Sequence, residues 1–207
     1  GAFRYRQAQC LGAYAHSGAT PRAERRDAVA AVSTFVVEMN AAWRAHDAAG
    51  EDLAVTFGQF ATDPDEHAFS KVAGRVDFSL DVRSQSAATL AAVRRDALAA
   101  IERIAIEHRV SFDPGPLTTT EPACMDDAVI EALKAAARDH GLTPPLMPCG
   151  AGHDAAVFAA IGVPTGMLFI RNANGSHNPR EHMDMKDFAS AAAILSDACL
   201  SGRLIAR

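Results

Sequence analysis

The chain has 207 residues, of which 49% are hydrophobic, so it can bury one large core or two small ones. Its formal net charge is -5, and no cluster of Lys and Arg forms a basic patch, which argues against nucleic acid or an anionic membrane as a partner. No apolar run approaches the roughly 18 residues that a bilayer span needs, and no signal peptide opens the chain. These features predict a globular cytoplasmic protein.

The first half of the chain alternates strand and helix patterns in a recognisable order. Residues 3–11, 53–57, 76–82 and 110–112 have strand-like patterns, and residues 22–46 and 87–108 have apolar positions three and four apart, as in amphipathic helices. The order β-α-β-β-α-β is that of the split βαβ, ferredoxin-like arrangement, a four-stranded antiparallel sheet with two helices on one face. The predicted fold class is therefore α+β for this part, closing near Leu117.

The first predicted helix follows a turn-rich loop over residues 15–21. Thr20 is the expected N-cap, with Pro21 in the first turn. The residues expected to face the core recur at helical spacing and are Val29, Val32, Val36, Met39 and Trp43. A charged loop over residues 62–74 separates the second and third strands.

The second half predicts helices at 126–140, 155–161 and 187–200, with a buried strand at 163–170. Glycines at 150 and 152 indicate a tight loop before the middle helix. This tail cannot close a core alone, because a parallel sheet would need strands that the chain lacks. The chain also starts at Gly1-Ala2 without Met and enters a strand at once, so we expect it to be a piece of a longer protein.

Two loop segments carry the residues most suited to chemistry. Residues 150–155 read Gly-Ala-Gly-His-Asp-Ala, and residues 174–179 read Asn-Gly-Ser-His-Asn-Pro. They bracket the predicted strand at 163–170, where loops of α/β proteins carry function. Taken singly, each loop histidine also fits an ordinary surface role. The four cysteines are far apart and contain no CxxC pair, which is typical of reduced thiols, although Cys149 beside His153 leaves a catalytic thiol open.

In combination these segments resemble the hydantoinase/carbamoylase family of di-metal amidohydrolases, which includes N-carbamoyl-L-amino acid hydrolases, allantoate amidohydrolases and β-ureidopropionases. The first half carries three further matching segments: His-Ser-Gly-Ala-Thr-Pro followed by Arg-Arg-Asp-Ala at 16–28, Phe-Ser-Leu-Asp-Val-Arg at 78–83, and Thr-Thr-Glu-Pro at 119–122. The resemblance covers essentially the whole chain. It implies a lid and dimerisation domain at residues 1–117 and the C-terminal portion of a catalytic domain at residues 118–207.

The resemblance also implies a mechanism and partners. Two divalent metals (Zn, or Mn, Co or Ni) would activate a water that attacks the carbamoyl carbon of a ureido or carbamoyl acid, with a Glu as general base. His177 would be the last metal ligand, while the other ligands and the Glu would precede the lid, so we expect this chain alone to hold no metal and to be inactive. The lid would form a homodimer.

Within the lid, the resemblance implies that His16 reaches the neighbouring subunit's site and stabilises the oxyanion of the tetrahedral intermediate. Arg83 would clamp the substrate carboxylate, the alternative being an ion pair with Asp81 or Asp77. Ser70 stands where the family usually has a substrate-binding Asn, and His67 nearby is a candidate to replace that contact.

In the second half, the backbone of Gly150, Ala151 and Gly152 would lie along the substrate, and His153 would either bind substrate or orient this loop. A different class of function remains open from the first half alone. Many ferredoxin-like domains are non-catalytic modules that bind small ligands or dimerise. The two histidine loops of the second half favour the enzyme, because a sensor has no need of them.

Overall fold

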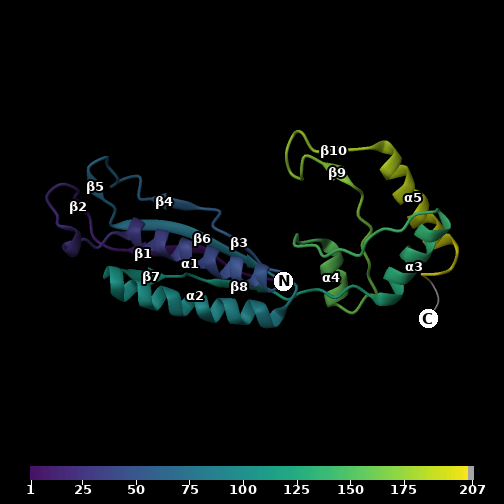
Figure 1. The fold of residues 1–207 in the computed structure, drawn as a ribbon, viewed down its shortest axis with the longest axis horizontal. Coiled ribbons are helices and arrows are strands. Elements are labelled where there is room, and N and C mark those ends of the chain that lie inside the picture. The colour runs from purple at the N-terminus through teal and green to yellow at the C-terminus, as the bar shows by residue number, and fades with distance from the viewer. Residues whose placement is uncertain (205–207) are drawn as a thin grey trace. The chain divides into compact units, whose positions relative to one another are not determined.

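The computed structural model describes residues 1–204 and divides into two compact units, Gly1–Pro122 and Ala123–Arg207. Each is described by itself, and Figure 1 shows the elements of both. None of the helices among the described residues combines the length and apolar character needed to cross a bilayer.

The first unit is built on one antiparallel sheet. Its central strands are β1 (Ala2–Leu11) and β6 (Arg75–Arg83). On the outer side of β6 lie β3 (Ala54–Thr56) and β4 (Phe60–Thr62), and on the outer side of β1 lie β7 (Ser111–Asp113) and β8 (Leu117–Thr120). Since β3 with β4 and β7 with β8 each act as one interrupted strand, the sheet has the four-stranded βαββαβ topology, and the predicted fold is confirmed.

One face of this sheet is buried by α1 (Ala28–Ala48) and α2 (Ala87–His108). Along β6, every second side chain is buried, beginning with Val76, while the residues between them, from Arg75 to Arg83, are half-buried on the opposite face. The aromatic centre of the core is Phe35 of α1, whose ring makes edge-to-face contacts with Phe57, Phe78 and Phe112.

The start of α1 differs from the sequence prediction. Residues 22–24 form a short 3-10 turn, η1 (Arg22–Glu24), and the helix begins only at Ala28. Its N-cap is Asp27, whose carboxylate accepts hydrogen bonds from Val29 N and Ala30 N, so the prediction of Thr20 as the cap is wrong. An acceptor at position 27 satisfies the free amides of the first turn, which releases residues 15–25 to form a loop.

The expected core stripe of α1 is only partly right. Val32 and Met39 are buried, whereas Val29, Val36 and Trp43 are only partly buried at the edge of the core. The remaining buried positions are Ala28, Ala31 and Phe35, so the buried face of α1 consists mainly of small residues and one aromatic ring.

The first unit ends later than the expected closure near Leu117. The strand β8 pairs with β1 as far as Ala2 opposite Thr120, and the compact unit extends to Pro122.

The second unit is mostly helical. It contains α3 (Asp127–Asp139), α4 (Asp154–Ala160) and α5 (Met185–Leu200), with a small hairpin of β9 (Asn172–Ala173) and β10 (His182–Met183). Its core is small: Leu133, Ala136 and Ala137 of α3 pack against Ile194 and Ala198 of α5. The three helices are those predicted, within a residue or two at each end.

The buried strand predicted at residues 163–170 does not form. That segment has no regular structure and is exposed or half-buried, because the described part of this unit offers no strand with which its backbone could pair. Large apolar side chains on α4 and nearby are exposed as well, namely Leu146, Met147, Val157, Phe158, Ile161, Val163 and Phe169. The unit therefore leaves much of its apolar surface uncovered, as expected for an incomplete α/β segment.

Candidate functional site

The structure brings the predicted residues His16 and Ser70 close together. The short strands β2 (Ala15–His16) and β5 (Lys71–Val72) pair antiparallel, with His16 opposite Lys71. Beside them, Ser17 N donates a 2.9 Å hydrogen bond to Ser70 O. The loops that carry the two residues, far apart in sequence, are thus held side by side at one end of the sheet, labelled β2 and β5 in Figure 1.

The His16 side chain is exposed, but its ring is held. Nδ1 accepts hydrogen bonds from the backbone amides of Gly18 at 3.2 Å and Ala19 at 3.1 Å. The loop around it is tied down by Arg25, whose guanidinium donates to Ser17 O and, at 3.0 Å, to Thr20 O. Sequence reasoning assigned no role to Arg25, although it lies in the Arg-Arg-Asp-Ala segment on which the family resemblance rests.

His67 lies in the same region as Ser70. Its Nδ1 is 3.0 Å from the hydroxyl of Thr62, and its backbone amide donates to Asp63 O at 2.9 Å. Between His67 and Ser70, the Phe69 side chain is fully exposed. Sequence reasoning did not single out Phe69.

Arg83 lies at the last position of β6, on the face of the sheet away from the helices. Its Nε and Nη2 donate to the same oxygen of Asp81, at 3.1 and 2.7 Å, and this hydrogen bond raises the pKa of the Arg83 guanidinium. Arg4 Nε lies 3.3 Å from the other Asp81 oxygen. The ion pair with Asp81, which the sequence left open beside the substrate clamp, is thus present, and both Arg83 and Asp81 are still partly open to solvent.

Within one chain, Arg83 and the His16 loop lie at opposite ends of the sheet. Gly12 N bonds to Gly74 O beside the start of β6, which places the His16 loop near Arg75. From Arg75 to Arg83 the strand runs nine residues, or about 27 Å at 3.4 Å per step. A small ureido acid is much shorter, so the structure does not bring these two predicted residues onto one substrate within a single subunit.

In the second unit, the Gly-rich loop before α4 is exposed. His153 occupies the N-cap position of α4, but its side chain makes no capping hydrogen bond. Its Nε2 lies 3.0 Å from Cys149 Sγ, and its ring meets the Phe169 ring edge-on. Gly150 and Gly152 have no left-handed backbone, and a Cβ at either would meet open space. Within the described part of this unit, neither a positive φ nor close packing therefore requires a glycine at these two positions.

The loop around His177 is rigidified by its own polar side chains. Glu181 accepts hydrogen bonds from Asn172 Nδ2 at 3.1 Å and from His177 N at 3.0 Å. The Ser176 hydroxyl, this backbone amide and Asn172 together hold the pKa of Glu181 below its usual value. His177 has a left-handed backbone, with φ 61°, and its side chain is exposed. The loop thus presents an imidazole on a fixed backbone.

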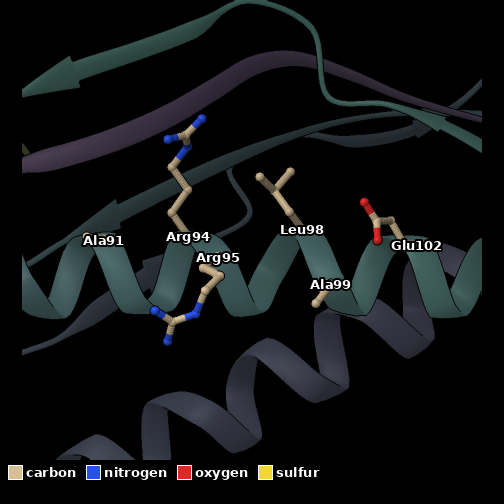
Figure 2. A pocket seen from close by; sticks show the side chains of 6 residues that line it. All are labelled: Ala91, Arg94, Arg95, Leu98, Ala99 and Glu102. Atoms are coloured by element: carbon tan, nitrogen blue, oxygen red, sulfur yellow. The ribbon is translucent and has the colours of Figure 1, made fainter.

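A shallow depression on α2 is unrelated to these residues. It has a volume of about 380 Å³ and is lined by Ala91, Arg94, Arg95, Leu98, Ala99 and Glu102. Figure 2 shows the side chains of these six residues. Arg94 points from α2 towards the strands, where its Nε donates to Tyr5 Oη at 3.3 Å. None of the predicted site residues lines this depression, so it is not the candidate site.

Comparison with known proteins supplies the missing context. The pattern of peptidase family M20/M25/M40 matches residues 8–201. The chain belongs to this family. Among family relatives, the allantoate amidohydrolase of Escherichia coli (strain K12) is 32% identical over 183 residues, which cover 87% of this chain and 43% of that protein. The N-carbamoyl-L-amino acid amidohydrolase of Geobacillus stearothermophilus is also 32% identical, over 87% of this chain and 42% of that protein.

Solved structures agree with this M20/M25/M40 assignment. The amidase of the hydantoinase/carbamoylase family from Burkholderia multivorans superposes on 98% of this chain with a TM-score of 0.84 and 28% identity, covering 48% of that structure. The family resemblance read from the sequence motifs is thereby confirmed. The chain spans less than half the length of these relatives.

Amidohydrolases of the M20/M25/M40 family are generally dependent on two metal ions, so the donor set of this chain matters. Among residues 1–204, no group of three or more His, Cys, Asp or Glu side chains is placed to hold a metal ion. His177 alone cannot bind a divalent cation tightly, because such sites need about four to six ligands. The residues present therefore do not form a metal site by themselves, and no catalytic step through a metal is assigned to them.

Proposed function

We propose that this chain is the lid domain and the C-terminal part of the catalytic domain of a metal-dependent amidohydrolase. The enzyme would hydrolyse a C–N bond of a ureido or carbamoyl acid such as an N-carbamoyl amino acid or allantoate. The observation that carries the proposal is the family match over residues 8–201, with relatives that act on such compounds. The non-catalytic ligand-binding module is the less favoured reading, because the family match continues through the second unit to residue 201, beyond the ferredoxin-like domain.

The second unit supports the assignment of an incomplete catalytic domain. Its segment at residues 163–170 lacks a pairing partner among the described residues, and α4 has no buried residue. Its exposed His177 would supply one ligand to the metal centre, whose remaining ligands come from polypeptide outside this chain. The backbone of Gly150, Ala151 and Gly152 would approach the substrate, and His153 would either contact it or hold the loop through Cys149.

The first unit supports a homodimer. Arg83 would bind the substrate carboxylate with its planar guanidinium, exchanging part of its bond with Asp81 for the substrate. His16 would donate a hydrogen bond to the oxygen that becomes negatively charged during hydrolysis, with Ser70 and His67 nearby binding the substrate. The His16 loop lies beside the Arg75 end of β6, and Arg83 ends this strand about 27 Å further on. Both residues would therefore act on one substrate only if His16 came from a second subunit.

We also propose that the enzyme is cytoplasmic. All four cysteines are free thiols in the part of the chain that the structure describes, as is usual for proteins of a reducing compartment.

Complementation tests the proposal as a whole. In the complete enzyme, His16→Ala and His177→Ala should each abolish most hydrolysis of allantoate or an N-carbamoyl amino acid, measured as ammonia release. In a mixed dimer, one of the two sites has an intact His177 and receives an intact His16 from the partner. Random reassociation of the two inactive variants makes half of the dimers mixed, so the mixture should regain about a quarter of wild-type activity, and purified mixed dimers about half.

The matched control mixes each variant with itself through the same dissociation and reassociation steps, which should restore nothing. Verified mixed dimers without recovered activity would refute the role of His16 in trans. A complete enzyme without hydrolytic activity on any ureido or carbamoyl acid would refute the proposed function.

A further inference from the structure

His16 is held by a hydrogen-bond arrangement that selects one form of its ring. Two backbone amides, those of Gly18 and Ala19, point at Nδ1 from 3.2 and 3.1 Å. A backbone N–H only donates, so Nδ1 must accept and carries no proton. The single proton of the neutral imidazole is then on Nε2, the nitrogen that takes no part in these two bonds. Because the His16 side chain is exposed, Nε2 is available as a hydrogen-bond donor.

The Gly18 amide is aimed at the ring by the peptide plane that it shares with Ser17 O. In a trans peptide the carbonyl and the N–H point in opposite directions. Arg25 Nη2 donates to Ser17 O on one side of this plane, and His16 Nδ1 accepts from Gly18 N on the other. Fixing the carbonyl thus fixes the amide. Without Arg25, the Ser17–Gly18 peptide could rotate and remove a donor from Nδ1.

Arg25 holds the rest of the turn in the same way. Its Nε donates to Thr20 O at 3.0 Å, and Thr20 N donates to His16 O at 3.1 Å, which closes the turn on both sides of the ring. Ser17 N is bonded to Ser70 O across the β2–β5 pair. The guanidinium is half-buried, and its fork can reach two carbonyls at once, which the single ammonium of a lysine cannot do with the same geometry.

We propose that Arg25 is a positioning residue that locks the His16 loop and so fixes His16 as the neutral tautomer with its proton on Nε2. The role of this fixed tautomer rests on the proposed function: Nε2–H would donate a hydrogen bond to the oxygen of the carbamoyl or ureido group. The positioning by Arg25 does not rest on it. A neutral donor that is already oriented stabilises developing negative charge without reorganisation during the reaction. The ligand class of this position is thus an anionic or carbonyl oxygen.

The test uses this chain as it is, with nitrogen-15 NMR of the His16 ring at pH 8 and amide hydrogen exchange at Gly18 and Ala19. In the wild type, Nδ1 should have the signal of an unprotonated nitrogen and Nε2 that of a protonated one. Arg25→Met should give a mixture of both tautomers and speed exchange at Gly18 by up to about tenfold, as expected for a lost hydrogen bond. Arg25→Lys should lie between the two.

The control is Arg22→Met, which removes an exposed arginine of the same turn. Among the described residues, no hydrogen bond or ion pair joins the Arg22 side chain to the His16 loop, so its spectra should match the wild type. A protonated Nδ1 in the wild-type chain would overturn the inference without any variant. An unchanged ring signal in well-folded Arg25→Lys and Arg25→Met would also overturn it.

The proposed function fails in a different way. If the ring and exchange results are as expected but His16→Ala leaves hydrolysis by the complete enzyme unchanged, the positioning stands and the oxyanion role is wrong. In the complete enzyme, Arg25→Met should lower kcat by at least about tenfold with KM within about threefold, because the donor is needed mainly as charge develops.

Discussion

Replacing Arg83 by lysine distinguishes a substrate clamp from a simple ion pair. In the structure, Arg83 directs two N–H groups to one oxygen of Asp81, and its side chain is 37% exposed. A pair of this kind contributes about 0–1 kcal/mol to the free energy of unfolding, and Arg83→Lys keeps the charge. The melting temperature of the chain should therefore change little.

Catalysis should respond far more strongly if the clamp is real. Losing one partner of a charge pair in a closed site costs about 2–5 kcal/mol, or roughly 30-fold to several thousand-fold in kcat/KM at 1.4 kcal/mol per tenfold. Since lysine keeps a charge but cannot make the bidentate contact, Arg83→Lys in the complete enzyme should fall at the lower end of that range. The assay is initial-rate hydrolysis of carboxylate-bearing carbamoyl substrates.

Arg75 provides a matched control on the same strand. It binds Asp77 through Nε and Nη2 at 3.1 and 3.0 Å and is 38% exposed, so its surroundings closely resemble those of Arg83. Arg75→Lys should leave kcat/KM within about threefold of wild type. If Arg83→Lys has the same small effect as Arg75→Lys, the clamp assignment is wrong and Arg83 serves only its pair with Asp81.

The remaining predictions concern metal, stability and pH. The purified chain should bind clearly less than one zinc ion per chain, and elemental analysis giving about two would show that the ligand set has been misplaced. Phe35→Ala should lower the free energy of unfolding by about 3–5 kcal/mol in urea titration, because the ring is fully buried. Val37→Ala, 64% exposed on the same helix, should change it by less than about 0.5 kcal/mol. The Glu181 carboxylate, whose pKa is lowered by its bonds, orders the His177 loop above pH 4.5 and should release it as the pH falls below that value, so the His177 amide should exchange faster once intrinsic rates are corrected. A loop equally ordered at pH 3 and pH 6 would contradict this.

The sequence alone determined elements whose signal is local. The strict alternation from Val76 to Val82 defined β6 and its buried face, since alternate side chains of a strand point to opposite sides. The helix α2 was predicted at its observed bounds from its apolar spacing, and the structure adds its N-cap, Ser86, whose hydroxyl accepts from Thr89 N. The order of these elements was enough to give the ferredoxin-like topology.

Other features depended on partners distant in the chain or outside it. Thr20 and Asp27 are both capable N-caps. In the structure Asp27 caps the helix, and the His16 loop before it pairs with β5, a partner far along the chain. Residues 163–170 have the composition of a buried strand, yet a strand forms only when its backbone pairs with a neighbouring strand, and none of the described strands pairs with this segment.

The residues of the candidate site could be predicted from the sequence, but their arrangement in space could not. Motifs identified His16, Ser70, Arg83 and His177, because each residue type suits its chemistry in a short segment. Only the tertiary structure decided that His16 lies beside Ser70 but far from Arg83, since that depends on which strands pair and in which direction. The two hydrogen bonds from Arg25 to the His16 loop could likewise not be predicted from the sequence, because they depend on where the Ser17 and Thr20 carbonyl groups point after the chain has folded.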